Sequence, residues 1–154
     1  MNVKRNPTRR FVVFASAGLA SVIGVSPAFA NADELAAAVA SYAGGQKITP
    51  GKIKIEIAEL VDNGNVVPIT VKVDSPMTSA NHVKAIAVFN EKNPQREVAK
   101  FTFGPRYGKS EVSTRIRLAT TQKLVAVAQM SDGTFWSDTV EVIVTLAACL
   151  EGET

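Results

Sequence analysis

The chain has 154 residues, of which 46% are hydrophobic, and this length and composition suit one globular domain. Four of its 17 basic residues and none of its 14 acidic residues lie in the first 30 positions, so the rest of the chain holds one more acidic than basic residue. That balance excludes a nucleic-acid-binding domain, which needs a basic surface.

The first 30 residues predict an export signal. A basic opening ends in Arg9-Arg10, an apolar run extends from Phe11 to Val25, and Ala28 and Ala30 form an A-x-A cleavage site. The apolar run is shorter than the about 20 residues of a membrane-spanning helix. We therefore expect export, cleavage after Ala30 and no membrane anchor afterwards. The arginine pair favours the twin-arginine route, which implies that the protein folds before it is exported.

A short helix is predicted over residues 31–45. Asn31 can cap it, and Leu35, Val39 and Tyr42 fall at i, i+4 and i+7, which places them on one apolar stripe. Two glycines at the end of this segment stop the helix. The stripe needs an apolar surface to cover it, so we expect the helix to pack against the domain or against a partner.

Residues 46–146 show the alternation of strands with one solvent-facing side. The predicted strands are 52–57, 66–73, 83–89, 97–103, 112–118, 123–130 and 134–146. Turn residues separate them, including Ser131-Asp132-Gly133, which is typical of a hairpin. Short strands at this spacing predict an all-β fold, an immunoglobulin-like antiparallel β-sandwich, behind the N-terminal helix.

The last predicted strand has two faces. Val140, Val142, Val144 and Leu146 should point inward. Ile143 has the opposite parity and is apolar as well, as are Val125 and Val127 on the preceding strand. Such residues mark either a partner-binding face or the face that the helix covers, and the sequence leaves this open.

Catalytic constellations are scarce. The only histidine, His82, shares a loop with Met77, and such a pair can hold copper in exported proteins, but two soft residues five apart are more often ordinary loop residues. Trp136 follows an Asp-Gly turn and is expected to belong to a packing cluster of the hairpin. We predict neither a metal site, nor a cofactor, nor an enzyme.

Cys149 is the only cysteine. An exported protein with one cysteine cannot close an internal disulfide, so the thiol is buried and inert, linked to another molecule, or reactive. It follows the last predicted strand, in a segment of residues 147–154 that we expect to form a flexible C-terminal tail. A thiol on such a tail can enter the cleft of another protein.

Several stretches carry a resemblance to a known family. They are SPMT at 75–78, VKAIAVFNEKNPQREVAKFTFGP at 83–105, GKSEVSTRIRLATTQ at 108–122 and MSDGTFW at 130–136. Together with the terminal VT-x-x-x-C and the twin-arginine-like signal, they closely resemble SoxY, the sulfur-carrier subunit of periplasmic thiosulfate oxidation.

The resemblance implies a carrier whose cysteine, here Cys149, is the covalent attachment point for sulfur. It implies a heterodimer with a SoxZ-like subunit. It also implies three kinds of enzyme partner: a haem enzyme that couples thiosulfate to the thiol, a metal-dependent hydrolase that releases sulfate and leaves a persulfide, and a sulfane dehydrogenase. The only added group is then the sulfur adduct itself.

The sequence departs from the family pattern around the cysteine, where the family typically reads Gly-Gly-Cys-Gly-Gly. Ala147 and Ala148 precede the thiol here, Leu150 and Glu151 follow it, and Gly152 is the one glycine of the tail. Alanine gives up part of the backbone freedom that glycine offers. A divergent carrier with another substrate is therefore an alternative reading, and so is an adaptor sandwich whose cysteine is incidental or forms an intermolecular disulfide.

Overall fold

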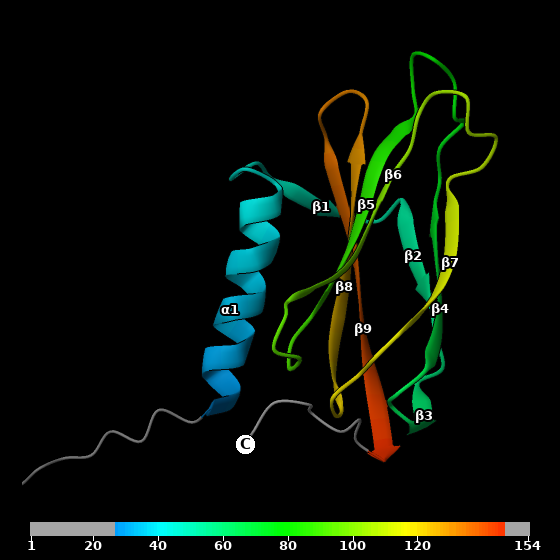
Figure 1. The fold of residues 1–154 in the computed structure, drawn as a ribbon. Coiled ribbons are helices and arrows are strands. Elements are labelled where there is room, and N and C mark those ends of the chain that lie inside the picture. The colour runs from blue at the N-terminus through cyan, green and yellow to red at the C-terminus, as the bar shows by residue number, and fades with distance from the viewer. Residues whose placement is uncertain (1–26, 147–154) are drawn as a thin grey trace, which may run out of the picture.

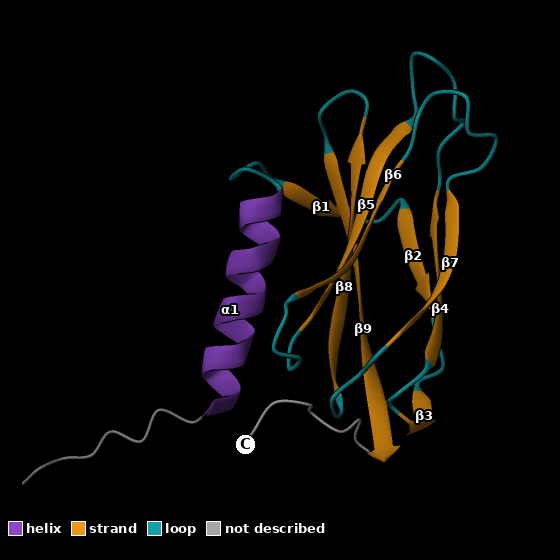
Figure 2. Cartoon of the chain, viewed as in Figure 1, coloured by secondary structure: helices purple, strands orange, loops and turns teal. Residues whose placement is uncertain are grey.

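The computed structural model describes residues 27–146 of the chain, and in that range one helix precedes nine strands (Figures 1 and 2). The helix is α1 (Pro27–Tyr42). The strands are β1 (Ile48–Pro50), β2 (Ile53–Glu56), β3 (Leu60–Asn63), β4 (Val67–Val73), β5 (Val83–Asn90), β6 (Glu97–Thr102), β7 (Glu111–Ile116), β8 (Gln122–Met130) and β9 (Phe135–Leu146).

The strands form two sheets that pack face to face, and α1 lies outside the larger one (Figure 1). The larger sheet has the order β1-β9-β8-β5-β6, with β3 also paired to β9, and the smaller sheet has the order β2-β4-β7. The long pairs are antiparallel, whereas β1 and β3 pair with β9 in parallel. The predicted sandwich is confirmed, with a mixed rather than purely antiparallel large sheet.

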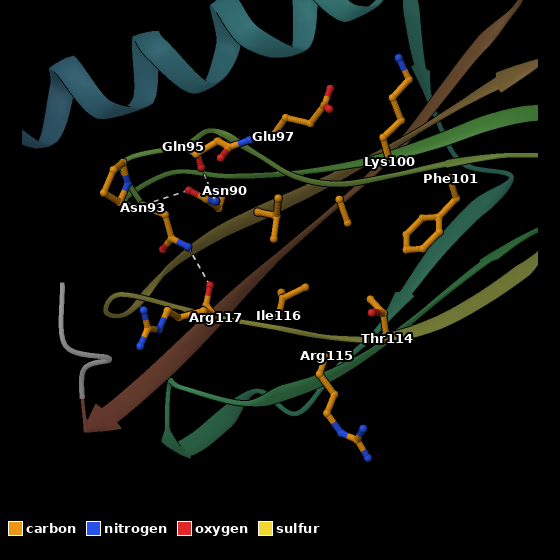
Figure 3. A pocket seen from close by; sticks show the side chains of 13 residues that line it. Asn90, Asn93, Gln95, Glu97, Lys100, Phe101, Thr114, Arg115, Ile116 and Arg117 are labelled. Atoms are coloured by element: carbon orange, nitrogen blue, oxygen red, sulfur yellow. Dashed lines mark hydrogen bonds between the residues drawn. The ribbon is translucent and has the colours of Figure 1, made fainter. Parts of the chain in front are cut away.

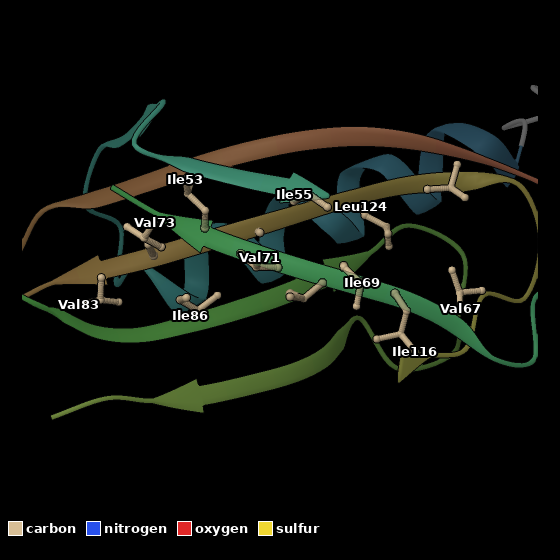
Figure 4. Close-up of a cluster of buried hydrophobic side chains, with 14 of the residues drawn as sticks. Ile53, Ile55, Val67, Ile69, Val71, Val73, Val83, Ile86, Ile116 and Leu124 are labelled. Carbon is tan, nitrogen blue, oxygen red and sulfur yellow. The ribbon is translucent and has the colours of Figure 1, made fainter. Parts of the chain in front are cut away.

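The core between the sheets is built from the inward positions of the alternating strands (Figure 4). On β4, for example, Val67, Ile69 and Val71 are buried and face the large sheet, where Ile86 and Leu124 are fully buried. Burying an aliphatic side chain of this size stabilises a fold by about 1.5 to 3 kcal/mol. The alternating apolar residues of the strands are therefore the residues that hold the two sheets together.

A second apolar cluster holds α1 on the outer face of the large sheet. Leu35 is buried there, and the Tyr42 ring contacts Phe89 and Phe135 edge to face, with ring centroids 5.6 and 6.1 Å apart. The predicted stripe of α1 is thus confirmed as its docking face. The helix ends where Gly44 and Gly45 adopt positive φ, a conformation that glycine reaches without strain.

The same cluster settles what the apolar residues of opposite parity do. Val127 is buried under α1 and Val125 packs at the edge of that cluster. Ile143 has the same parity but is half exposed, because it lies on β9 outside this cluster. On β8 these apolar residues therefore form the face that the helix covers. For Ile143 the other interpretation, a partner-binding face, remains.

Three details of the prediction were wrong. The helix begins at Pro27 rather than at Asn31, since proline suits the first helical position, where no amide hydrogen is needed, and Ala28 and Ala30 consequently fall in its first turn. The strands β1 and β3 were not predicted. Leu146 is exposed rather than part of the core, because β9 extends past the end of the smaller sheet (Figure 1).

Replacing Tyr42 by phenylalanine should stabilise the protein. The Tyr42 hydroxyl is buried and has no hydrogen-bond partner among the described residues. Tyr42→Phe keeps the ring and removes this unsatisfied group, so we expect the free energy of unfolding to rise by about 1 kcal/mol. Urea unfolding at pH 7 measures the change. A less stable variant would contradict the expectation and would mean that the hydroxyl has a partner.

The same variant should respond differently to alkaline pH. Burial, with a contribution from Glu97, raises the pKa of Tyr42 to about 12 from its ordinary value of 10.0. Between these two pKa values the unfolded chain has lost the phenol proton and the folded chain has kept it. The wild type therefore loses stability as the pH rises through this range. The phenylalanine variant lacks this loss. The difference in stability between the two proteins should therefore widen from pH 10 towards pH 12.

Candidate functional site

The predicted site residues lie mostly beyond the part of the chain that the structure describes. Those outside it are Arg9, Arg10, Ala147, Ala148, Cys149 and Gly152. What the structure does describe is the point from which the predicted carrier tail departs, which is Leu146 at the end of β9.

The end of β9 is fixed on both sides. On one side β3 pairs in parallel with residues 143–146, and Gly64 donates its amide hydrogen to the Leu146 carbonyl at 3.0 Å. On the other side β8 stops pairing at Val142, and Thr121 takes over by accepting a hydrogen bond from the Val144 amide at 3.0 Å. The backbone is therefore held up to the last described residue.

This anchoring limits how far the thiol can travel. Cys149 is three residues beyond Leu146. An extended chain covers at most about 3.6 Å per residue, so the Cys149 backbone stays within about 11 Å of the Leu146 Cα atom. A protein that acts on this thiol must consequently approach the end of the sandwich where β9 ends.

A groove lies between β6 and β7, where the two sheets part, and has a volume of about 650 Å³ (Figure 3). Two of its asparagine side chains have partners within the protein. Asn93 donates to the Arg117 carbonyl at 2.7 Å and accepts from the Ala119 amide and from Gln122, each at 2.9 Å. Asn90 donates to the Gln95 carbonyl at 2.9 Å.

These amides join the turn after β5 to the turn after β7, so their role is structural. Sequence reasoning missed this network. The segment Asn-Glu-Lys-Asn-Pro-Gln at 90–95 indicates a turn, but it does not say that its side chains reach a second turn about 25 residues away. The network supports β8, which in turn holds β9.

Met77 and His82, the weakly indicated metal pair, each have another partner. The Met77 sulfur is buried in the core and accepts the amide hydrogen of Val83 at 3.4 Å. The ring nitrogen Nδ1 of His82 lies 3.1 Å from the Thr78 carbonyl. Over residues 27–146, no three residues of the types His, Cys, Asp or Glu gather as a metal-binding group would.

Trp136 belongs to a packing cluster, as predicted. Its ring packs at the edge of the main core, its indole nitrogen donates to Thr134 at 3.1 Å, and the Lys52 ammonium lies 4.4 Å from the ring centroid. Lys52 itself has a positive φ of 55°, in the turn between β1 and β2. These contacts leave the ring face covered rather than open to a ligand.

Fold and site together define a class of protein: an immunoglobulin-like β-sandwich whose longest strand leads into a short C-terminal segment with the only thiol. In its described part, no helix is both long and apolar enough to span a membrane. No curated protein sequence matches the chain.

The family whose sequence profile matches the chain is described as "Sulfur oxidation protein SoxY", and the match covers residues 39–149. The solved structure of the sulfur carrier protein SoxY from Chlorobium limicola f thiosulfatophilum is 35% identical, with a TM-score of 0.63, and the alignment covers 75% of this chain and 99% of that one. The chain therefore belongs to the SoxY family, a family of carrier proteins of sulfur oxidation.

Other solved structures share the fold alone. A superoxide reductase (neelaredoxin) from Ignicoccus hospitalis is 22% identical with a TM-score of 0.54, over 61% of this chain and 80% of that one. A putative superoxide reductase from Thermotoga maritima is also 22% identical, with a TM-score of 0.53, over 64% and 87%. At this identity the likeness extends to the sandwich and carries nothing about chemistry.

Proposed function

We propose that the protein is a periplasmic sulfur carrier that holds thiosulfate-derived sulfur covalently on Cys149. The observation that supports the proposal is the family match, which covers residues 39–149 and so extends from α1 to the only cysteine of the sequence. The anchored end of β9 supports it, because this strand presents the following segment at one end of a rigid sandwich.

The proposed chemistry begins with oxidation. The Cys149 thiol and thiosulfate lose two electrons and one proton, and a sulfur–sulfur bond forms, which gives a cysteine S-thiosulfonate. A haem enzyme accepts the electrons. A metal-dependent hydrolase then adds water across the bond to the sulfonate, so that sulfate and two protons leave and a persulfide anion remains on the cysteine. A sulfane dehydrogenase, where present, accepts six electrons from the outer sulfur, which takes three oxygen atoms from three water molecules and releases six protons, so that a cysteine S-sulfonate forms. The hydrolase then adds water again, sulfate and two protons leave, and the Cys149 thiolate is restored.

A single cysteine suits this sequence of steps. A persulfide exchanges readily with a neighbouring thiol, which would transfer the sulfur to the wrong residue. The chain has no second cysteine to capture it. In this proposal a SoxZ-like subunit pairs with the sandwich, and the signal at Arg9 and Arg10 exports the folded protein before cleavage after Ala30.

The test is the intact mass of the protein after incubation with thiosulfate and the haem enzyme. Wild-type protein should gain the mass of a thiosulfate adduct, whereas Cys149→Ser, which has no thiol, should gain none. Both proteins should unfold at the same urea concentration, since Cys149 follows the last strand of the sandwich in the sequence. An adduct on Cys149→Ser would overturn the proposal. A stoichiometric disulfide-linked dimer of the wild type in non-reducing electrophoresis would favour the adaptor instead.

A further inference from the structure

Exposed apolar side chains gather where β9 ends. Leu60 on β3, Ile143 on β9 and Leu146 are 59%, 51% and 65% exposed. Leu60 and Ile143 are directly paired in the sheet, so both side chains point to the same face. Large apolar side chains that are grouped in this way on a soluble surface mark an interaction site more often than single ones do.

A groove continues this apolar surface. β1 pairs with residues 135–137 of β9 and β3 with residues 143–146, so in the described pairings the β9 edge between them has no ladder partner. The Asp138 carboxylate accepts the Ile55 amide hydrogen at 2.8 Å and holds β2 beside this gap. The gap forms a groove of about 580 Å³, lined by Ile55, Ile57, Glu59, Val140, Glu141 and Ile143.

The border of this surface is acidic. Glu59, Asp62 and Glu141 are exposed around Leu60 and Ile143. The cation that the sheet register places nearest is Lys123, which lies opposite Glu141 on β8 and leaves an excess of negative charge. We call Ile57, Leu60 and Ile143, with these three carboxylates, the β3–β9 patch.

We infer that the β3–β9 patch is the docking surface for a different protein subunit, one whose contacting face has an apolar centre and a border of lysine and arginine. The inference rests on the proposed function, because it assigns the place where a partner of the carrier binds. Ile143 is three residues before Leu146, and Cys149 is three residues after it. A subunit on the patch is therefore held at the end of the sandwich from which the segment with Cys149 continues.

The negative charge of the border argues against two other occupants of the patch, a second copy of this chain and its own residues 147–154. A symmetric dimer of this chain would place the patch against itself, so that the three carboxylates of each copy faced those of the other. Residues 147–154 of the same chain carry Glu151 and Glu153 and no basic residue, so they too would bring acid against acid. A basic border on a second protein satisfies the carboxylates while its apolar centre covers Leu60 and Ile143.

The experiment measures binding of the purified SoxZ-like subunit to the mature chain by calorimetry. Ile143→Lys and Leu60→Lys should each weaken binding by at least about tenfold, since they place a charge in the apolar centre. Glu59→Lys with Glu141→Lys should weaken it as well and should reduce its dependence on salt. Tyr107→Lys is the matched control, because Tyr107 is 56% exposed on the loop between β6 and β7, outside the patch. It should bind within about twofold of wild type.

Three results would overturn the inference. The first is unchanged binding by Ile143→Lys. The second is a dimer of the chain alone, seen by sedimentation, that Ile143→Lys dissociates. The third is hydrogen exchange at residues 57–62 that speeds up when residues 147–154 are deleted, which would make the tail the occupant. Cys149→Ser should bind the subunit normally, so a failure of sulfur loading with intact binding counts against the proposed function and not against the patch.

Discussion

Deleting Ala147 and Ala148 together should abolish sulfur loading while leaving the fold intact. The Leu146 carbonyl is held by the Gly64 amide at 3.0 Å, so the deleted length cannot be recovered from β9. The deletion moves Cys149 from three residues beyond Leu146 to one, and its reach falls from about 11 Å to about 4 Å. We expect the rate of thiosulfate coupling to drop by at least about 100-fold, because misplacement of a reacting group by a few ångströms removes the gain from proximity.

The control keeps the length and changes only the backbone freedom. Ala147→Gly with Ala148→Gly restores the two glycines that the family typically has before the cysteine, and glycine populates more conformations than alanine. This variant should load at the wild-type rate or faster. The measurement is the time course of adduct formation by intact mass, with unfolding curves recorded in parallel. A shortened chain that loads as fast as the wild type would mean that the tether length does not matter.

The sandwich was predictable because its strands alternate. Val67, Ile69 and Val71 on β4, or Ile53 and Ile55 on β2, show period two in sequence and are buried on one face in the structure. The stripe on α1 was visible in the same way, through Leu35 and Tyr42. Patterns of this kind depend only on which side of a helix or strand is exposed to solvent, and the local sequence contains that information.

The two short strands that were missed depend on contacts far away in sequence. β3 reads Leu-Val-Asp-Asn and has no alternation, and it is a strand because residues 143–146 offer it a parallel edge. β1 is three residues long and ends in Pro50, which weakens any strand prediction. Leu146 follows the alternation of β9, but the length of the opposing sheet decides whether it is covered, and no window of β9 reveals that length.

One part of the candidate site could likewise be predicted from local sequence, and the other part could not. The thiol could be identified from the sequence because Cys149 is unique and follows the last strand. The β3–β9 patch could not, since Leu60 and Ile143 are 83 residues apart and meet only through the parallel pairing that the sequence pattern hides. Glu59 and Glu141 likewise stand in the sequence without a motif that would connect them. Their meaning comes from lying together around an apolar surface.

Replacing Leu124 by alanine should destabilise the protein more than any surface change. Leu124 is fully buried on β8 and pairs with Asn90 on one side and Val140 on the other, at the centre of the main core. Leu→Ala at such a site removes buried apolar surface and leaves a cavity, which costs about 2 to 5 kcal/mol. Equilibrium unfolding in urea at pH 7 should show a loss of about 3 kcal/mol.

The matched control makes the same chemical change at Leu60, which is 59% exposed, and should alter stability by no more than about 0.5 kcal/mol. Leu124→Ala also bears on the site, because β8 is the strand that holds β9 up to the Gln122–Val142 pair. Sulfur loading by Leu124→Ala should therefore fail at a lower temperature than loading by the wild type, in step with unfolding. Equal stability of Leu124→Ala and Leu60→Ala would show that the two sheets do not pack around β8 as described.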